Sequence, residues 1–148
     1  MFDIGLVPCT ATKNPQGVTP LTLYKGGPFS LMVRHARQRC KRIVIMSAKY
    51  GLLEENARVQ YYDTFIGDLD AGARQELMVR VRSQLKDMQG QTALSYLWKP
   101  YYSVLQIANV WDIPVATPYM GLPSLVLYKV LSNEIKDPNP TRRRLVVE

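Results

Sequence analysis

Short apolar runs alternate with longer amphipathic segments along the chain, and this alternation limits the possible folds more than any other feature. The run Ile4–Val7 stops at Pro8, and Ile43–Met46 is a second run of the same kind. Such runs are typical of strands buried on both faces of a sheet. Strands joined through helices pair in parallel, because a parallel neighbour requires a long crossover connection. We therefore predict an α/β fold with a mainly parallel sheet of about four strands and helices on both faces.

The remaining elements continue this strand–helix order. A chain of 148 residues has the commonest size for a single core, so we expect one domain over residues 1–148, with a basic surface tail at about 138–148. Residues 47–70, after the second strand, are expected to be irregular. The spacing of apolar residues predicts helices over 30–40, 71–88, 100–109 and 121–136, and further strands over 92–98 and 113–116.

Composition narrows the class of protein. Nineteen Lys and Arg residues against twelve Asp and Glu give a net charge of +7, which favours polyanionic partners such as nucleic acid or phosphorylated metabolites. No apolar run approaches the roughly 20 residues that span a bilayer, and the first residues lack a basic signal-peptide region, so we expect a cytoplasmic protein without a membrane partner. With two cysteines and one histidine, a His/Cys zinc site is nearly excluded, and we expect no metal and no cofactor. The sequence leaves open whether the protein forms an oligomer.

Two loops with unusual chemistry follow the first two predicted strands. Ligands of parallel sheets bind at the carboxyl ends of strands. In the first loop Thr10 and Thr12 let backbone N–H groups approach an anion, and Lys13 can neutralise it. The alternative is an ordinary polar connection, since the glycines of a Walker A loop are missing. Cys9 is either a catalytic thiol or a packed one.

The second loop runs from Ser47 to Gly51, and an aromatic patch follows it. Lys49 suits a phosphate contact, and Tyr50 suits stacking or capping of a ligand. In the patch Tyr61-Tyr62-Asp63-Thr64, two rings can hold a base or sugar while Asp63 hydrogen-bonds it or acts as a general base. The alternative is a core tyrosine with Asp63 capping the following turn.

Basic residues cluster in two places. They can track a phosphate backbone, although such runs are commonly a solvated face. His35 lies within the first cluster, where a lone histidine is more often structural or solvated than catalytic. The clusters consist of Arg34, Arg37, Arg39, Lys41 and Arg42, and of Arg142, Arg143 and Arg144.

Several strings resemble one family. The segments Val7-Pro8-Cys9 to Lys13, Leu23–Phe29 and Met46–Leu53, together with Tyr62-Asp63, resemble DUF6884, a family of small bacterial, archaeal and phage proteins of unknown function. The middle segment is distantly similar to the YaaA peroxide-stress family, which is associated with DNA binding. The resemblance implies a Rossmann-like domain linked to nucleobase or nucleic-acid modification. The positions that match are Cys9, Lys13, Tyr24, Ser47, Lys49, Tyr50, Tyr62 and Asp63, whereas Gln60-Tyr61 departs from the proline that many members carry before Tyr-Asp.

Three functions are compatible with these features. The first is a nucleotide- or base-processing enzyme that performs N-glycosidic cleavage or base exchange, with Asp63, Lys49 and Cys9 as catalytic candidates. Its substrate would be bound by Thr10, Thr12, Lys13, Tyr24, Ser47, Tyr50 and Tyr62. The second is a non-catalytic nucleic-acid-binding module, which predicts affinity that falls steeply with salt. The third is a protein-interaction inhibitor, such as a phage protein, with a degenerate site.

Overall fold

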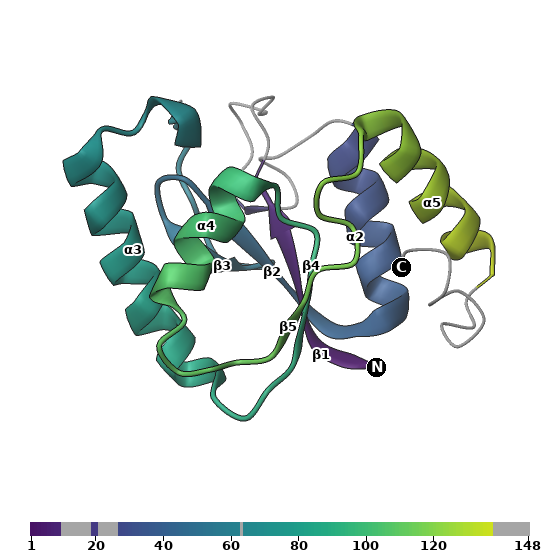
Figure 1. Cartoon of the computed structure of the whole chain (residues 1–148), viewed down its shortest axis with the longest axis horizontal. Helices are drawn as coiled ribbons and strands as arrows, with labels where there is room; N and C mark the ends of the chain where they lie inside the picture. The colour runs from purple at the N-terminus through teal and green to yellow at the C-terminus, as the bar shows by residue number, and fades with distance from the viewer. Residues whose placement is uncertain (10–18, 21–26, 63, 138–148) are drawn as a thin grey trace.

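The structure, a computed structural model, describes residues 1–9, 19–20, 27–62 and 64–137. Its centre is a five-stranded sheet with the order β3-β2-β1-β4-β5 (Figure 1). The strands are β1 (Phe2–Pro8), β2 (Cys40–Ser47), β3 (Gly51–Glu54), β4 (Ala93–Ser95) and β5 (Val115–Ala116). The helices are α2 (Gly27–Arg39), α3 (Ala71–Leu85), α4 (Lys99–Ala108) and α5 (Ser124–Lys136), with short 3-10 helices η1 (Ile66–Asp68) and η2 (Lys86–Met88).

The sheet is mostly parallel. β1 pairs in parallel with both β2 and β4, and β4 pairs in parallel with β5, whereas β3 is antiparallel to β2. The predicted α/β fold with a mainly parallel sheet is confirmed. The prediction of about four strands is wrong, because β3 adds a fifth strand within the segment expected to be irregular. The predicted strand over 92–98 is shorter than expected, since only Ala93–Ser95 pair with neighbours.

Helices cover both faces of the sheet. From β1 the chain passes through α2 to β2, and from β4 it passes through α4 to β5 in the opposite direction along the sheet. Because parallel crossovers are right-handed, opposite directions place α2 and α4 on opposite faces. Figure 1 shows α2 beside α5 on one side and α3 beside α4 on the other. Among the described residues, no helix is both long enough and apolar enough to cross a membrane.

β3 depends on contacts that are remote in sequence. The Ser47 hydroxyl accepts hydrogen bonds from the backbone N–H groups of Lys49 (3.1 Å) and Tyr50 (3.0 Å), which closes the turn between β2 and β3. Gly51 then adopts a φ of 75°, a conformation that favours glycine. On the outer edge of β3, the Gln84 amide of α3 accepts from the N–H of Leu52 (2.7 Å) and donates to its carbonyl (3.0 Å). This side chain occupies backbone groups that a further strand would otherwise bind.

Replacing Gln84 with alanine is therefore expected to lower the free energy of unfolding by about 1–3 kcal/mol, because two backbone groups of Leu52 lose their partner. Urea denaturation followed by circular dichroism measures the change. Gln75, an exposed residue of the same helix, provides the control, and its alanine variant should unfold like the parent chain. Equal stability of the two variants would contradict the bracing role of Gln84.

Candidate functional site

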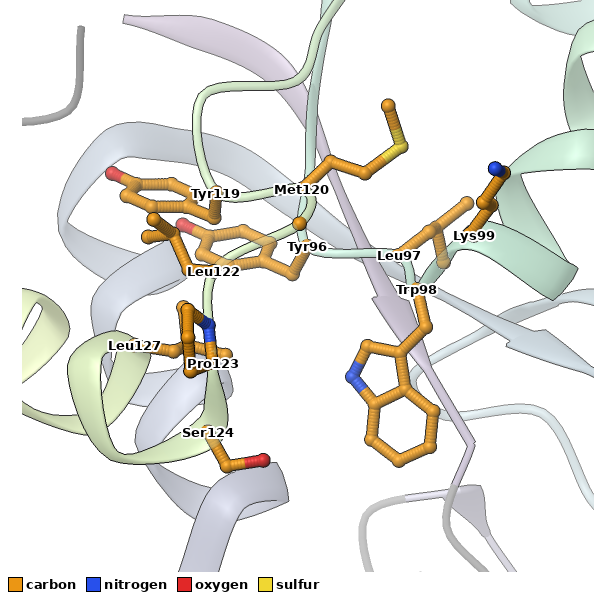
Figure 2. Close-up of a pocket in the computed structure, with 11 residues that line it drawn as sticks. Tyr96, Leu97, Trp98, Lys99, Tyr119, Met120, Leu122, Pro123, Ser124 and Leu127 are labelled. Atoms are coloured by element: carbon orange, nitrogen blue, oxygen red, sulfur yellow. The ribbon is translucent and has the colours of Figure 1, made fainter.

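A pocket lies at the carboxyl ends of β4 and β5. Because the crossovers after β1 and β4 run in opposite directions, this edge contains the point at which an open α/β sheet binds its ligands. The pocket has a volume of about 390 Å³. Its walls are residues 96–99, which follow β4, and residues 119–124 with Leu127, which follow β5 (Figure 2). Sequence reasoning placed the site after β1 and β2 and did not find this pocket.

Aromatic rings form opposite parts of the pocket wall. The rings of Tyr96 and Tyr119 stack with their centroids 5.4 Å apart and their planes 11° apart. Figure 2 shows both hydroxyls pointing the same way, away from Trp98 and Lys99. Trp98, on the other side, keeps 47% of its surface exposed. The pocket therefore presents the Trp98 indole and small accessible parts of the two buried tyrosine rings to a ligand, while the tyrosine hydroxyls face the protein interior.

Two helices begin at the same pocket. Lys99 is the first residue of α4 and Ser124 the first of α5, and both line the cavity. No side chain makes a capping hydrogen bond at either start, among the described residues. The first N–H groups of a helix have no partner within it, and the helix dipole makes that end positive. Together with the Lys99 ammonium, these groups make the pocket suited to an anion.

A buried polar network lies behind the tyrosine wall. His35 of α2 has no exposed surface, and its Nδ1 lies 2.6 Å from the Tyr96 hydroxyl. Its Nε2 lies 2.8 Å from Glu134 Oε1 of α5, to which the Tyr119 hydroxyl also donates at 2.8 Å. Arg39 donates to the backbone carbonyl of Glu134 at 2.9 Å. His35 is thus neither solvated nor isolated, and the network joins α2, α5 and the segments after β4 and β5.

The ionisation states of this network follow from its burial. Burial lowers the pKa of His35, against the opposing effect of its hydrogen bond to Glu134. Burial raises the pKa of Glu134, but the hydrogen bonds from His35 and Tyr119 outweigh it and the net pKa is lowered. The neutral imidazole therefore donates from Nε2 to the Glu134 carboxylate and accepts from Tyr96 at Nδ1. Burial, followed by the nearby Glu134 charge, raises the pKa of Tyr119, which keeps its proton.

Acid is expected to destabilise the fold, beginning below the ordinary His35 pKa of 6.5. Because the folded pKa is lower than the unfolded one, the unfolded chain binds more protons as the pH falls through this range, and the free energy of unfolding decreases. Glu134 acts in the same direction below its ordinary value of 4.5. His35 is the single histidine of the chain, so melting temperatures between pH 5 and 8 report on it. A His35→Gln variant with an equally steep decline over pH 5–7 would contradict this assignment.

Cys9, which follows β1, and Ser47, the last residue of β2, lie at the same edge of the sheet. The backbone N–H of Cys9 donates to the Met46 carbonyl at 2.9 Å, and the buried Cys9 Sγ lies 3.0 Å from the Tyr101 hydroxyl of α4. Ser47 is fully buried, and its Oγ lies 2.7 Å from the Tyr62 hydroxyl.

The cation and rings of the second loop form one cluster with Tyr62. The Lys49 ammonium lies 5.4 Å from the centre of the Tyr50 ring and 5.8 Å from that of Tyr62. The two rings meet edge to face at 5.4 Å. Neither these three residues nor Cys9 and Ser47 line the pocket after β4 and β5. Their predicted catalytic and substrate-binding roles stay predictions. The predicted residues Thr10, Thr12, Lys13, Tyr24, Asp63, Arg142, Arg143 and Arg144 lie outside the described residues.

The basic cluster around α2 is largely engaged within the protein. Arg37 pairs with Glu55 at 3.0 Å, Lys41 with Asp3 at 3.3 Å, and Arg42 with Glu54 at 2.7 Å. Arg39 is buried in the network behind the pocket, whereas Arg34 is exposed. These contacts neutralise much of the local positive field. Nucleic-acid binding by this face stays a prediction.

Comparison with known proteins gives the family. The model of the family of unknown function DUF6884 matches residues 4–124. The chain belongs to DUF6884. The DUF6884 match covers the sheet and the pocket up to Ser124, so α5 beyond its first residue and the network residue Glu134 lie outside it.

Neither the curated proteins nor the solved structures gave a match, and the distant similarity to YaaA is not confirmed. Among the described residues, no group of three or more His, Cys, Asp or Glu side chains is placed to hold a metal ion.

Proposed function

We propose that the protein binds a nucleotide, or a base within a nucleic acid, in the pocket after β4 and β5, and processes it there. The observation that carries the proposal is that aromatic rings, the Lys99 ammonium and the starts of two helices line one cavity. The strand order suits a Rossmann-like arrangement, and sheets of that kind bind nucleotides beside the point where the crossovers change direction.

Lys99 and the starts of α4 and α5 suit a phosphate group. Lys99 contributes a cation, and the starts of α4 and α5 contribute backbone N–H groups at the positive ends of two helix dipoles. The hydroxyl of Ser124 adds a donor on the wall across from Lys99. Pro100, at the second position of α4, lacks an N–H, and the position is one where a helix tolerates this loss. A phosphate placed here would receive charge-assisted hydrogen bonds from both sides.

The aromatic end suits a flat ring. The half-exposed indole of Trp98 gives a π surface on which any nucleobase can stack, and such stacking contributes about 1–3 kcal/mol per base. The buried, stacked rings of Tyr96 and Tyr119 form the wall across from it. A volume of about 390 Å³ is within the range of sites for small molecules. A sugar phosphate alone would leave the aromatic surface uncovered, so the pocket favours a ligand that carries a base.

The reaction class that we propose is N-glycosidic cleavage or base exchange. The Tyr101 hydroxyl and the Cys9 thiol at this edge are buried and 3.0 Å apart, and the Tyr101 ring meets that of Trp98 with 6.5 Å between centroids, but neither residue lines the pocket. The assignment of Asp63 as the general base stays a prediction, because residue 63 is outside the described residues.

Replacing Lys99 with glutamine is expected to weaken binding of a nucleoside monophosphate about tenfold, because the phosphate loses its cation. Isothermal titration calorimetry with adenosine, guanosine, cytidine and uridine monophosphates measures the effect. The control is Lys86→Gln, which removes the same charge from an exposed position in η2. If Lys86→Gln weakened binding as much as Lys99→Gln, the effect would reflect net charge, and the pocket would not be the phosphate site.

A further inference from the structure

The buried network behind the pocket has a geometry that goes beyond holding helices together. We infer that His35 and Glu134 are positioning residues of the pocket, which hold the hydroxyls of Tyr96 and Tyr119 and thereby fix the aromatic wall for the ring of a ligand. The inference rests on the proposed function, and it specifies the class of ligand further: a molecule recognised by its base and not only by its phosphate.

Directed hydrogen bonds connect the wall to the two helices. The Tyr96 hydroxyl donates to His35 Nδ1 (2.6 Å), and His35 Nε2–H donates to Glu134 Oε1 (2.8 Å). The Tyr119 hydroxyl donates to the same oxygen (2.8 Å) and also lies 3.2 Å from His35 Nε2. One oxygen of the Glu134 carboxylate therefore accepts the hydrogen bonds that hold both tyrosines, from Tyr119 directly and from Tyr96 through His35. Each ring is held at its hydroxyl tip, at the end remote from the pocket.

Ring contacts fix the planes of Tyr96 and Tyr119, in addition to the hydrogen bonds that hold their hydroxyls. The His35 ring meets Tyr96 at 80° and Tyr119 at 86°, with centroids 5.5 Å and 5.3 Å away. The two tyrosine rings, lying 11° from parallel, are thus packed against a perpendicular imidazole and against each other. Rotation of either ring about its χ2 bond would break its edge-to-face contact with the imidazole, and another χ1 rotamer would take the hydroxyl away from its partner. The surface that faces the ligand is preorganised before binding.

The buried network consists of polar and charged side chains, and packing alone does not require such groups. A buried carboxylate with its histidine and arginine is costly to desolvate, and apolar side chains of similar volume often stabilise a fold equally well. Glu134 even keeps its Oε2 buried without a hydrogen-bond partner among the described residues. What the polar groups add, and apolar groups do not, is a defined orientation for two tyrosines that line the pocket.

The test compares a ligand that has a base with one that lacks it. Tyr119→Phe keeps the ring but removes its hydroxyl, and Glu134→Gln keeps the shape but removes the carboxylate that orders the hydrogen bonds. Calorimetry with the four nucleoside monophosphates and with ribose 5-phosphate gives both affinities for each variant. We expect the affinity for the best nucleotide to fall about fivefold to tenfold in both variants, while that for ribose 5-phosphate changes less than twofold. Tyr102→Phe, a half-buried tyrosine of α4 outside the network, is the matched control.

A second measurement needs no variant. Since His35 is the single histidine of the chain, the ring-nitrogen NMR signals of a histidine-labelled sample belong to it alone. Although His35 does not line the pocket, a nucleotide should shift these signals, whereas ribose 5-phosphate should leave them in place. The unliganded protein should show the neutral tautomer with its proton on Nε2.

The outcomes separate the two proposals. Equal weakening of nucleotide and ribose 5-phosphate in Tyr119→Phe would overturn the inference, because the network would then only hold α5 in place. Unchanged nucleotide affinity in both variants, with unshifted His35 signals, would overturn it too. If the parent chain bound neither ligand, the proposed function would fail, and the inference would fail with it.

Discussion

Replacing Glu134 with alanine is expected to lower the free energy of unfolding by about 3–5 kcal/mol. The carboxylate is 2% exposed, and it accepts hydrogen bonds from His35 and Tyr119. Its removal leaves a buried imidazole N–H and a buried phenol without their acceptor, and each unsatisfied group costs about 1–3 kcal/mol. It also removes the carboxylate nearest the buried Arg39, whose Nε lies 3.9 Å from Glu134 Oε1.

Chemical denaturation at pH 7 measures this loss, and Glu76→Ala is the control because Glu76 is an exposed glutamate in the middle of α3. The control should change stability by no more than about 0.5 kcal/mol. A change below about 1 kcal/mol in Glu134→Ala would show that the network contributes little to folding, and the arrangement of α5 against α2 would then need another explanation.

The second large effect is expected from Gly5→Val. Gly5 lies in β1 where α2 crosses most closely, and a Cβ added there would lie 3.0 Å from the Ala36 Cβ and 3.1 Å from the Cys40 Sγ. Both neighbours are buried and have no flexible end that could move away. The two further methyl groups of valine would force the helix from the sheet, which costs about 3 kcal/mol or slightly more.

Gly27→Val provides the control, because no heavy atom lies within 4 Å of a Cβ placed at Gly27. Thermal and urea unfolding should place this variant within about 0.5 kcal/mol of the parent chain. Comparable losses at the two positions would mean that the cost arises from backbone entropy or propensity, and that the close approach of α2 to β1 is not its cause.

The features predicted from sequence are those determined by local pattern. The buried runs Ile4–Val7 and Ile43–Met46 predicted β1 and β2, which pair in parallel. Leu77, Val81 and Leu85, spaced by four, predicted α3, and all three are buried. Cys9 follows β1 as expected, whereas Ser47, expected just after the second strand, is the last residue of β2; parallel pairing brings these strand ends together at one edge.

The features that sequence reasoning missed depend on contacts between distant residues. β3 is four residues long, and its edge is completed by Gln84, more than thirty positions later in the chain. His35 becomes part of a network because Tyr96 and Glu134, 61 and 99 residues away, reach it. One signal was available for the pocket: Trp98-Lys99-Pro100 and Pro123-Ser124 mark the starts of the helices that follow β4 and β5, and helix starts are positions where anions bind.

The central claim is that a base-bearing phosphate compound occupies the pocket after β4 and β5, and the two indole N–H signals of a ¹⁵N-labelled sample test it most directly. The chain has two tryptophans: Trp98 lines the pocket, whereas the Trp111 Nε1–H donates to the Arg82 carbonyl at 2.8 Å, away from it. Titration with the nucleoside monophosphates should shift the Trp98 indole signal progressively and leave that of Trp111 unchanged. Saturable binding in which the Trp98 signal does not move would place the ligand elsewhere and contradict the account.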